Sequence, residues 1–271
     1  MKKVKLGLAL GSGGLCGVSH IGFLQVLEEN NIKIDMISGI SMGAVVGGLY
    51  ASGMSLKEME EVALKINKKD IISINYFKIL KESLFDGTKL EKYLKNLVKT
   101  ENIEDAKIPF LAEATDLKTG KLKIFDKGSF VEALRASSAV PGIFPPIKKD
   151  DTFYVDGGVI ETVPYKILKE KGADIIIAVN CLNEFKLEVL PKNSIGTFMA
   201  SYDCTQCMAW KLDKELNKND YDLYCFDNTE GINPLSLELS SIKKLLESGR
   251  QSALRYLDEI KNLIDKKQKN C

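Results

Sequence analysis

Ser41 has the sequence surroundings of a nucleophile. The run Gly39-Ile40-Ser41-Met42-Gly43 fits the G-x-S-x-G pattern, in which a serine lies on a sharp strand-to-helix turn with its hydroxyl exposed. Such a serine attacks acyl groups, but its hydroxyl is a weak nucleophile that needs an adjacent base. The chain contains one histidine, His20. Either His20 is that base, or another group does this work.

The residues on both sides of Ser41 predict the strand and the helix that this turn requires. Residues Ile34–Ile37 are typical of a buried strand, and Ala44–Tyr50 are typical of the start of a packed helix. The strand–turn–helix setting is therefore present in the sequence.

A glycine-rich loop near the N-terminus is a second candidate for chemistry. The apolar run Val4–Leu10 predicts a strand that leads into Gly11-Ser12-Gly13-Gly14-Leu15-Cys16-Gly17, and a helix follows. Backbone N–H groups at the start of a helix bind anions, such as the oxyanion of acyl transfer or a nucleotide phosphate. The dinucleotide fingerprint fails because Cys16 replaces its third glycine, and the P-loop sequence is absent. A purely structural turn explains the loop equally well.

A third element is Tyr154-Val155-Asp156-Gly157-Gly158, which by itself predicts an ordinary surface turn. In this order, however, the glycine loop, the Ser41 turn and the Asp-Gly-Gly sequence resemble the patatin-like phospholipase family. The segments His20–Leu24, Ala114–Gly120 and Ala136–Pro145 are also similar to stretches of bacterial members. The resemblance covers roughly residues 4–180.

The resemblance implies a serine–aspartate dyad that cleaves acyl esters of phospholipids, lysophospholipids or simpler lipids. Ser41 would be the nucleophile and Asp156 the base, and the amides of Gly13 and Gly14 would form the oxyanion hole. Neither a metal nor a cofactor is implied. His20 is then expected to be a partly buried side chain that caps or packs the first helix. The motif residues that would support the site are Ser12, Gly17, Gly39, Gly43, Gly157 and Gly158.

Cys16 is the main departure from the family pattern, which usually has arginine or lysine at this position. Ser12 replaces a glycine, which is a milder change. The loss of the cation could slow the reaction, favour neutral esters or be compensated by lysines elsewhere. A catalytically weak lipid- or protein-binding relative is therefore an alternative. Cys16 as a second nucleophile is disfavoured, because no histidine is clearly placed to activate it.

Composition indicates a soluble enzyme rather than a nucleic-acid-binding or membrane-spanning protein. The 271 residues carry 38 Lys and Arg against 37 Asp and Glu, and no basic patch interleaved with aromatic residues is found. No apolar run reaches the roughly 18 residues of a membrane span. Six scattered cysteines favour free thiols in a reducing cytoplasm.

We expect one domain over residues 1–271, with a motif-bearing core at about 4–180 and the helices and strand of 190–271 packed on it.

The order of predicted elements favours a three-layer α/β/α fold with a central, mostly parallel sheet. The segment Ile71–Phe85 is apolar and aromatic with interspersed lysines, and it is the expected lid or interfacial surface. Bilayer contact, core packing and a dimer contact all explain this pattern. Transient contact with the inner membrane surface therefore stays open.

Further strands are expected at Ile108–Ala114, Lys121–Phe125, Phe153–Val155, Asp174–Asn180 and Asp222–Phe226, and helices at Lys57–Asn67, Thr88–Lys99, Phe130–Ser138, Ser194–Leu216 and Ile242–Lys266.

Overall fold

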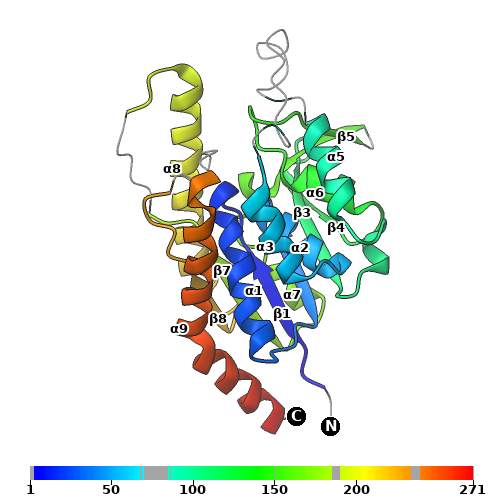
Figure 1. Cartoon of the computed structure of the whole chain (residues 1–271), viewed down its shortest axis with the longest axis vertical. Helices are drawn as coiled ribbons and strands as arrows, with labels where there is room; N and C mark the ends of the chain where they lie inside the picture. The colour runs from blue at the N-terminus through cyan, green and yellow to red at the C-terminus, as the bar shows by residue number, and fades with distance from the viewer. Residues whose placement is uncertain are drawn as a thin grey trace.

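One β-sheet organises the chain (Figure 1). The computed structural model describes residues 3–67, 69, 85, 87–149, 151–184, 190–232 and 239–270. Within these residues the sheet has eight strands. They are β1 (Leu6–Leu10), β2 (Met36–Ile40), β3 (Phe110–Asp116), β4 (Lys121–Phe125), β5 (Ile147–Lys149), β6 (Thr152–Asp156), β7 (Ile175–Asn180) and β8 (Leu223–Phe226).

The strands follow the order β5-β6-β3-β2-β1-β7-β8. Both β2 and β6 pair with one edge of β3, and β4 pairs with the opposite edge. The neighbours β3, β2, β1, β7 and β8 are all parallel. By contrast, β4, β5 and β6 are antiparallel to their partners. The sheet order reverses between β1 and β7, and open α/β sheets place their binding sites at the carboxyl ends of strands at such a point.

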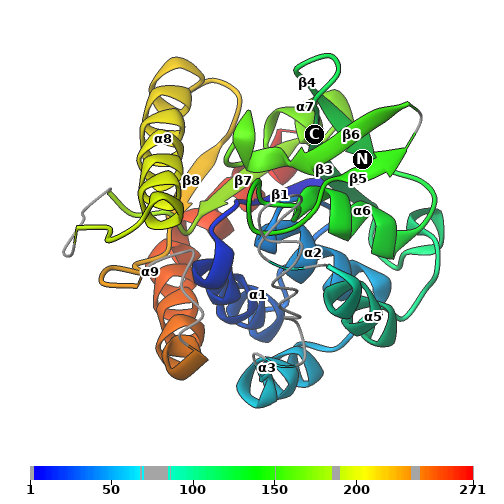
Figure 2. The ribbon, with the colours of Figure 1, turned by 90° about the horizontal axis from the view of Figure 1, so that it is seen from above.

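Helices cover both faces of the sheet (Figure 2). On one face lie α1 (Ser19–Glu29), α2 (Met42–Ser52), α6 (Phe130–Ser137) and α9 (Ile242–Lys269), with α3 (Leu56–Lys65) and α5 (Thr88–Leu97) farther out. The other face carries α7 (Lys166–Glu170) and α8 (Ser194–Leu216), which are joined where Asp213 accepts a hydrogen bond from Lys166 at 2.7 Å. This arrangement confirms the three-layer, mostly parallel α/β fold expected from the sequence.

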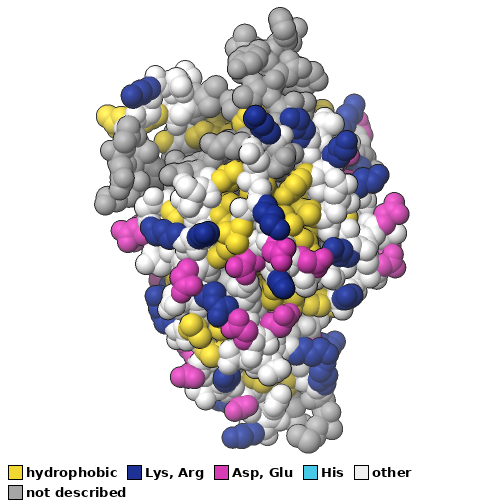
Figure 3. Space-filling model, viewed as in Figure 1, with side chains coloured by type: hydrophobic (Ala, Val, Ile, Leu, Met, Phe, Trp, Pro, Cys, Tyr) yellow, Lys and Arg dark blue, Asp and Glu magenta, His cyan; other side chains and the backbone are white. Residues whose placement is uncertain are grey.

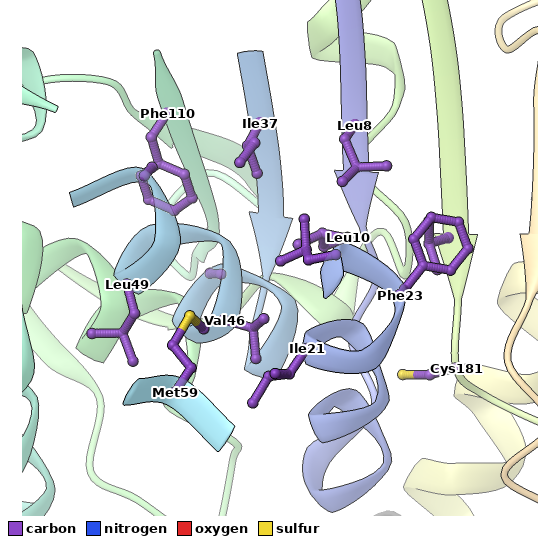
Figure 4. Packing of buried hydrophobic residues seen from close by; sticks show 14 of the residues in the cluster. Leu8, Leu10, Ile21, Phe23, Ile37, Val46, Leu49, Met59, Phe110 and Cys181 are labelled. Carbon is purple, nitrogen blue, oxygen red and sulfur yellow. The ribbon is translucent and has the colours of Figure 1, made fainter. Parts of the chain in front are cut away.

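Alternating strand residues build the two halves of the core. Leu8, Leu10, Ile37 and Phe110 point toward α1 and α2, where they pack against other buried side chains (Figure 4). The residues between them pack on the α7 side, and they include Ala9, Met36 and Leu111. Because successive strand side chains point to opposite faces, a strand buried on both sides is apolar throughout.

Helices α1 and α9 touch backbone to backbone. A Cβ atom on Gly22 would lie 2.0 Å from the Leu246 carbonyl oxygen, and one on Gly249 would lie 1.8 Å from the Ser19 carbonyl oxygen. No side chain fits at either position. The glycine pair therefore allows the C-terminal helix to pack directly on the helix that follows the glycine-rich loop.

The structure changes several details of the sequence prediction. The strand before Ser41 is Met36–Ile40 rather than Ile34–Ile37, because Asp35 is occupied in binding the Leu6 backbone at the start of β1. The short elements β5 and α7 were not expected. Apart from the buried Phe85, the expected lid Ile71–Phe85 lies outside the described residues. Among the helices that are described, none is long and apolar enough to cross a membrane.

Candidate active site

Ser41 occupies a strained turn between β2 and α2. Its φ of 55° and ψ of −124° are rare for a residue with a side chain, and such strain is concentrated at functional sites. The flanking glycines are required by close contacts. A Cβ on Gly39 would lie 2.6 Å from the Ala44 nitrogen, and one on Gly43 would lie 2.2 Å from the Leu10 carbonyl oxygen. The expected strand–turn–helix setting is confirmed.

The Ser41 side chain faces a cavity rather than open solvent. The residue is only 5% exposed, which corrects the expectation of an exposed hydroxyl. Its backbone N–H donates to the Ser137 hydroxyl at 3.0 Å, and that hydroxyl donates to the Glu113 carbonyl at 2.6 Å. The end of α6 thus fixes the turn. Ser138, the next residue, uses its hydroxyl for the Leu134 carbonyl, so neither serine of this pair has the place of a nucleophile.

Asp156 is brought to Ser41 by the pairing of two strands with β3. Strand β2 is parallel to β3 and ends with Ile40 beside Glu113. Strand β6 is antiparallel and ends with Asp156 beside Ala114, the next residue of β3. The two strands therefore approach each other end to end along one edge of β3. Ser41 and Asp156 lie where they meet.

The Asp156 carboxyl is buried and only partly hydrogen bonded. Its Oδ1 accepts the Gly158 N–H at 2.8 Å, while Oδ2 has no partner of regular geometry among the described residues. Burial raises the pKa of Asp156 to about 7, against the lowering influence of hydrogen bonds from the Ser41 hydroxyl and the Gly158 amide. Ser41 is thus a neighbour whose hydrogen bond is not fully aligned, as is common in catalytic sites before substrate binds.

The two glycines after Asp156 are needed for close approach. A Cβ on Gly157 would lie 2.6 Å from the Glu113 carbonyl oxygen, and one on Gly158 would lie 2.8 Å from Nε2 of Gln206. A larger residue at Gly157 would push the end of β6 away from β3. The Asp-Gly-Gly sequence is therefore not the surface turn that it predicts when taken alone.

The glycine-rich loop has two amides without a partner among the described residues. The Gly11 N–H donates to Val179, the Ser12 N–H donates to Thr162, and the Gly13 carbonyl accepts the Cys16 N–H. In the part of the chain that the structure describes, the amides of Gly13 and Gly14 have no partner. Buried backbone donors are nearly always paired, so two adjacent free donors form a ready site for an anion.

The loop packs on the first turn of α2, directly after Ser41. A Cβ on Gly17 would lie 2.6 Å from Cβ of Met42, and a Cβ on Gly13 would lie 2.3 Å from Sγ of Cys181. Both contacts require glycine. Gly14 and Ser41 line the same cavity. The loop, the serine and the aspartate, which are distant in sequence, thus converge on one place.

The cavity next to Ser41 has a volume of about 300 Å³ and walls of mostly apolar side chains. It runs beside α2 and is bounded by α3 and α5. On the face that carries α1 and α3, Figure 3 shows a central group of apolar side chains surrounded by charged ones. The walls include Leu15, Val18, Ile21, Met42, Val45, Val46, Leu49, Met54, Met59, Val62, Ala63, Leu94, Leu97, Val140 and Phe144, and Ser41 and Ser138 also line the cavity.

Cys16 does not line the cavity, and its thiol is in an unreactive state. The residue is 1% exposed, and its thiol donates to the Ile232 carbonyl at 3.6 Å. Burial raises the pKa of Cys16 to about 11, so the thiol stays protonated at neutral pH. Cys16 is thus neither a competing nucleophile nor a replacement for the charge of the usual basic residue.

His20 is fully buried, which corrects the expectation of a partly buried side chain. Its Nε2 is 3.0 Å from the Gly11 carbonyl oxygen, and its Nδ1 is 3.7 Å from Oδ2 of Asp227. Neither ring nitrogen contacts Ser41 or Asp156, and His20 is absent from the cavity wall. The structure therefore does not place the imidazole as a base for Ser41.

Gln206 of α8 is a site residue that sequence reasoning missed. Its Oε1 accepts the Ser12 hydroxyl at 3.1 Å, and its Nε2 donates to the Gly158 carbonyl and, at 3.0 Å, to the Tyr202 hydroxyl. One side chain thus links the glycine-rich loop to the segment after Asp156. No local pattern marks a glutamine for such a role. Among the described residues, no group of three or more His, Cys, Asp or Glu side chains could hold a metal ion.

The family model of patatin-like phospholipases matches residues 8–169, which include the loop, Ser41 and Asp156. This chain belongs to the patatin-like phospholipase family. An NTE family protein of Mycobacterium tuberculosis is 37% identical over 176 residues, which are 65% of this chain and 49% of that protein. The lysophospholipase NTE1 of Cryptococcus neoformans is 34% identical over 182 residues, 65% of this chain and 11% of its own length. The human patatin-like phospholipase domain-containing protein 6 is 30% identical over 183 residues, 65% of this chain and 13% of its own length.

Two solved structures share this patatin-like fold at low sequence identity. VipD from Legionella pneumophila superposes with a TM-score of 0.53 and 16% identity, over 96% of this chain and 67% of VipD. The type III effector ExoU gives a TM-score of 0.51 and 13% identity, over 95% of this chain and 53% of ExoU. The patatin-like chain spans about half or less of the length of the three sequence relatives. Gln206 and Asp227 lie beyond residues 8–169, the part that the family model matches.

Proposed function

We propose that this patatin-like protein hydrolyses acyl esters of lipids, with Ser41 as nucleophile and Asp156 as base. The observation that carries the proposal is the meeting of β2 and β6 on one edge of β3, which brings these two residues together. The free amides and the apolar cavity beside them support the same reaction. Membership of the family supports the substrate class.

In the first half of the reaction, the Ser41 hydroxyl attacks the ester carbonyl while the Asp156 carboxylate accepts its proton. The carbonyl oxygen becomes negatively charged and receives hydrogen bonds from the Gly13 and Gly14 amides. Because these donors are fixed before the reaction, they need no reorganisation, and each is worth about 3 kcal/mol in comparable sites. Asp156 then gives the proton to the departing alcohol, and the fatty acyl group stays on Ser41.

In the second half, Asp156 removes a proton from a water molecule that attacks the acyl-enzyme. The oxyanion forms again at the same amides. When it collapses, the fatty acid leaves and the proton returns to Ser41. No imidazole is required, provided that the carboxyl has a suitable pKa. Burial supplies this condition by raising the pKa of Asp156 to about 7, where a base is most effective at neutral pH.

The cavity supports an acyl chain as the part of the substrate that is bound. Its walls are almost entirely apolar, and burying such a chain contributes about 0.8 kcal/mol per methylene group. The relative from Cryptococcus neoformans is named a lysophospholipase, which makes lysophospholipids the first substrates to examine. Substrates of this class reside in membranes, so the proposed reaction includes transient contact with a lipid surface.

Hydrolysis of p-nitrophenyl esters over a series of acyl lengths tests the proposal. Wild type should turn over, Ser41→Ala and Asp156→Asn should lose activity, and a fluorophosphonate should label wild type but not Ser41→Ala. His20→Gln should keep substantial activity, because it retains a nitrogen donor but cannot serve as an imidazole base. Absence of both turnover and labelling in wild type would reject the hydrolase and favour a lipid- or protein-binding relative. Thermal stabilisation by nucleotides would favour the nucleotide-binding alternative.

A further inference from the structure

A buried polar cluster lies behind the glycine-rich loop, on the side away from the cavity. Ser19 donates its hydroxyl to Oδ2 of Asp227 at 2.5 Å, and His20 places its Nδ1 3.7 Å from the same oxygen. All three side chains are inaccessible or nearly so. Burying such groups is unfavourable unless they interact, so their presence calls for an explanation beyond packing.

The contacts of His20 fix the position of one proton. A carbonyl oxygen only accepts, so Nε2 must carry the hydrogen that it donates to Gly11. In the neutral ring, Nδ1 is then an acceptor that faces Asp227. At 3.7 Å the contact is too long for a hydrogen bond, so it is an ion pair when both groups are charged and a polar contact when both are neutral. Burial favours the uncharged form, because it lowers the pKa of His20 and raises the pKa of Asp227. Both forms keep the bond from Nε2 to Gly11.

The hydrogen bonds of the loop show what this bond accomplishes. The Gly11 carbonyl is held by His20, and the Ser12 carbonyl accepts the Cys181 thiol at 3.2 Å. The N–H groups of both residues are bound as well. The loop is therefore fixed at every polar group just before the two free amides of Gly13 and Gly14. His20 also lies in the first turn of α1, so a single side chain ties the end of the loop back to its beginning.

Asp227 is itself fixed by elements from the C-terminal part of the chain. Its N–H donates to the Asn180 carbonyl at 2.9 Å at the end of β7. Ser252 of α9 donates to the Phe226 carbonyl at 2.8 Å, and the Gly249 contact brings α9 against Ser19. The support of the loop thus depends on residues that the family model does not match.

We propose that His20, oriented by Asp227, is a positioning residue that holds the Gly11–Gly17 loop so that the Gly13 and Gly14 amides point at the reacting carbonyl. The inference rests on the proposed hydrolase function and assigns a role to two residues outside the dyad. Neither residue touches the substrate. Loss of His20 frees the Gly11 carbonyl and lets the loop turn its amides away from the oxyanion. The defect therefore falls on the transition state and not on binding of the ester.

The test compares His20→Leu with His20→Gln, because the glutamine amide can still donate to Gly11. We expect His20→Leu to lower kcat by about tenfold to hundredfold, less than the complete loss of an oxyanion donor, with KM changed less than about twofold. A trifluoromethyl ketone that mimics the tetrahedral intermediate should lose affinity by the same factor. His20→Gln should recover most of both losses.

A second pair of variants covers the case in which His20→Leu does not fold. Asp227→Asn keeps an acceptor for the Ser19 hydroxyl and offers a donor to Nδ1 of His20, so its kcat and ketone affinity should stay near those of wild type. Asp227→Leu should lose both, as His20→Leu does. Ser52→Ala is the matched control, since Ser52 is buried at the end of α2, where its hydroxyl donates to the Leu49 carbonyl and accepts the Lys99 N–H. It should cost stability without changing kcat or ketone affinity.

Unchanged kcat and ketone affinity in His20→Leu, or equal losses in the leucine and glutamine variants, would overturn the positioning role alone. If wild type shows neither turnover nor fluorophosphonate labelling, the proposed function fails and this inference falls with it. The two failures are thus told apart by the wild-type measurement.

Discussion

Asp156, the last residue of strand β6, lies beside Ser41, which directly follows strand β2. The two residues meet because both strands pair with the same edge of β3. The separation of the two residues is therefore set by backbone hydrogen bonds and not by the length of the chain between them. Gly157 allows this arrangement, since a side chain there would collide with the Glu113 carbonyl. This arrangement buries the Asp156 carboxyl, and burial opposes its ionisation.

The rate of ester hydrolysis should rise with pH through about 7 and then level off. Asp156 must be ionised to accept the Ser41 proton, and burial raises its pKa to about 7. A kcat/KM profile from acid to alkaline pH measures the midpoint. Glu161 and Asp203 provide controls, because burial raises their pKa values to about 7 and about 6. Glu161→Gln and Asp203→Asn should leave the midpoint unchanged, and a shift in either would assign the titration elsewhere.

Asp156→Asn should make the folded protein more stable, and more so at pH 8 than at pH 5. The pKa of Asp156 is about 7 in the folded chain and 3.8 in its usual state. The contribution of Asp156 to the free energy of unfolding is therefore fully present below pH 3.8 and is lost as pH rises through about 7. The amide has no charge to bury and can still accept the Gly158 N–H. Thermal unfolding at both pH values measures the difference. Asp105→Asn, at an exposed site, should have little effect at either pH, and a pH-independent gain at Asp156 would contradict the argument.

Ser137→Ala should weaken catalysis although Ser137 takes no part in the reaction. Its removal leaves the buried Ser41 N–H without a partner, which costs about 1–3 kcal/mol and releases the strained turn. We expect kcat to fall by about tenfold or more, together with a lower melting temperature. Ser138→Ala is the control for loss of a neighbouring hydroxyl, because the Ser138 hydroxyl bonds the Leu134 carbonyl and not the Ser41 turn. Equal kcat values for the two variants would show that α6 does not position Ser41.

Gly13→Ala should be rescued in part by a second substitution at Cys181. The new Cβ would lie 2.3 Å from the Cys181 sulfur, so the single variant must shift the loop. Cys181→Ala removes that sulfur, although it also removes the thiol bond to Ser12. A double-mutant cycle in kcat/KM should therefore show a positive coupling between the two sites. Strict additivity would mean that the loop is disturbed for another reason.

Leu49→Trp should shorten the acyl chains that the protein accepts. Ser41, Val45 and Leu49 are spaced one helical turn apart, so Leu49 lines the cavity about 12 Å along α2 from Ser41. A bulkier side chain there should reduce kcat/KM for long esters and spare short ones. Leu64→Trp on the exposed side of α3 should leave the chain-length profile as in wild type. A uniform loss over all lengths would point to misfolding or to a different acyl site.

The sequence was most informative where function depends on local backbone geometry. The Ser41 turn and the glycine-rich loop were predicted because glycine spacing reports close contacts between neighbouring segments. The meeting of Asp156 with Ser41 was expected only through the family resemblance, because a strand pattern does not specify the partner or the direction of pairing. Whether the whole chain is one domain, and whether Ile71–Phe85 forms a lid, stay predictions.

The supporting residues were missed for a related reason. Ser137, Gln206 and Asp227 reach the site from α6, α8 and the end of β8, and they act through hydrogen bonds that have no local signature. The sequence predicts a partly buried His20, whereas the structure buries it fully beside Asp227, which lies far away in the sequence.

The glycine pair between α1 and α9 makes the residue types at these two positions depend on each other. Because Gly22 and Gly249 each admit the backbone of the other helix, substitution of either would separate the helices and withdraw support from the loop. Selection should therefore act on the two positions together. Among homologues that extend past the matched core, those with glycine at both places should keep this docking of the last helix, and those that have lost one should have lost the other.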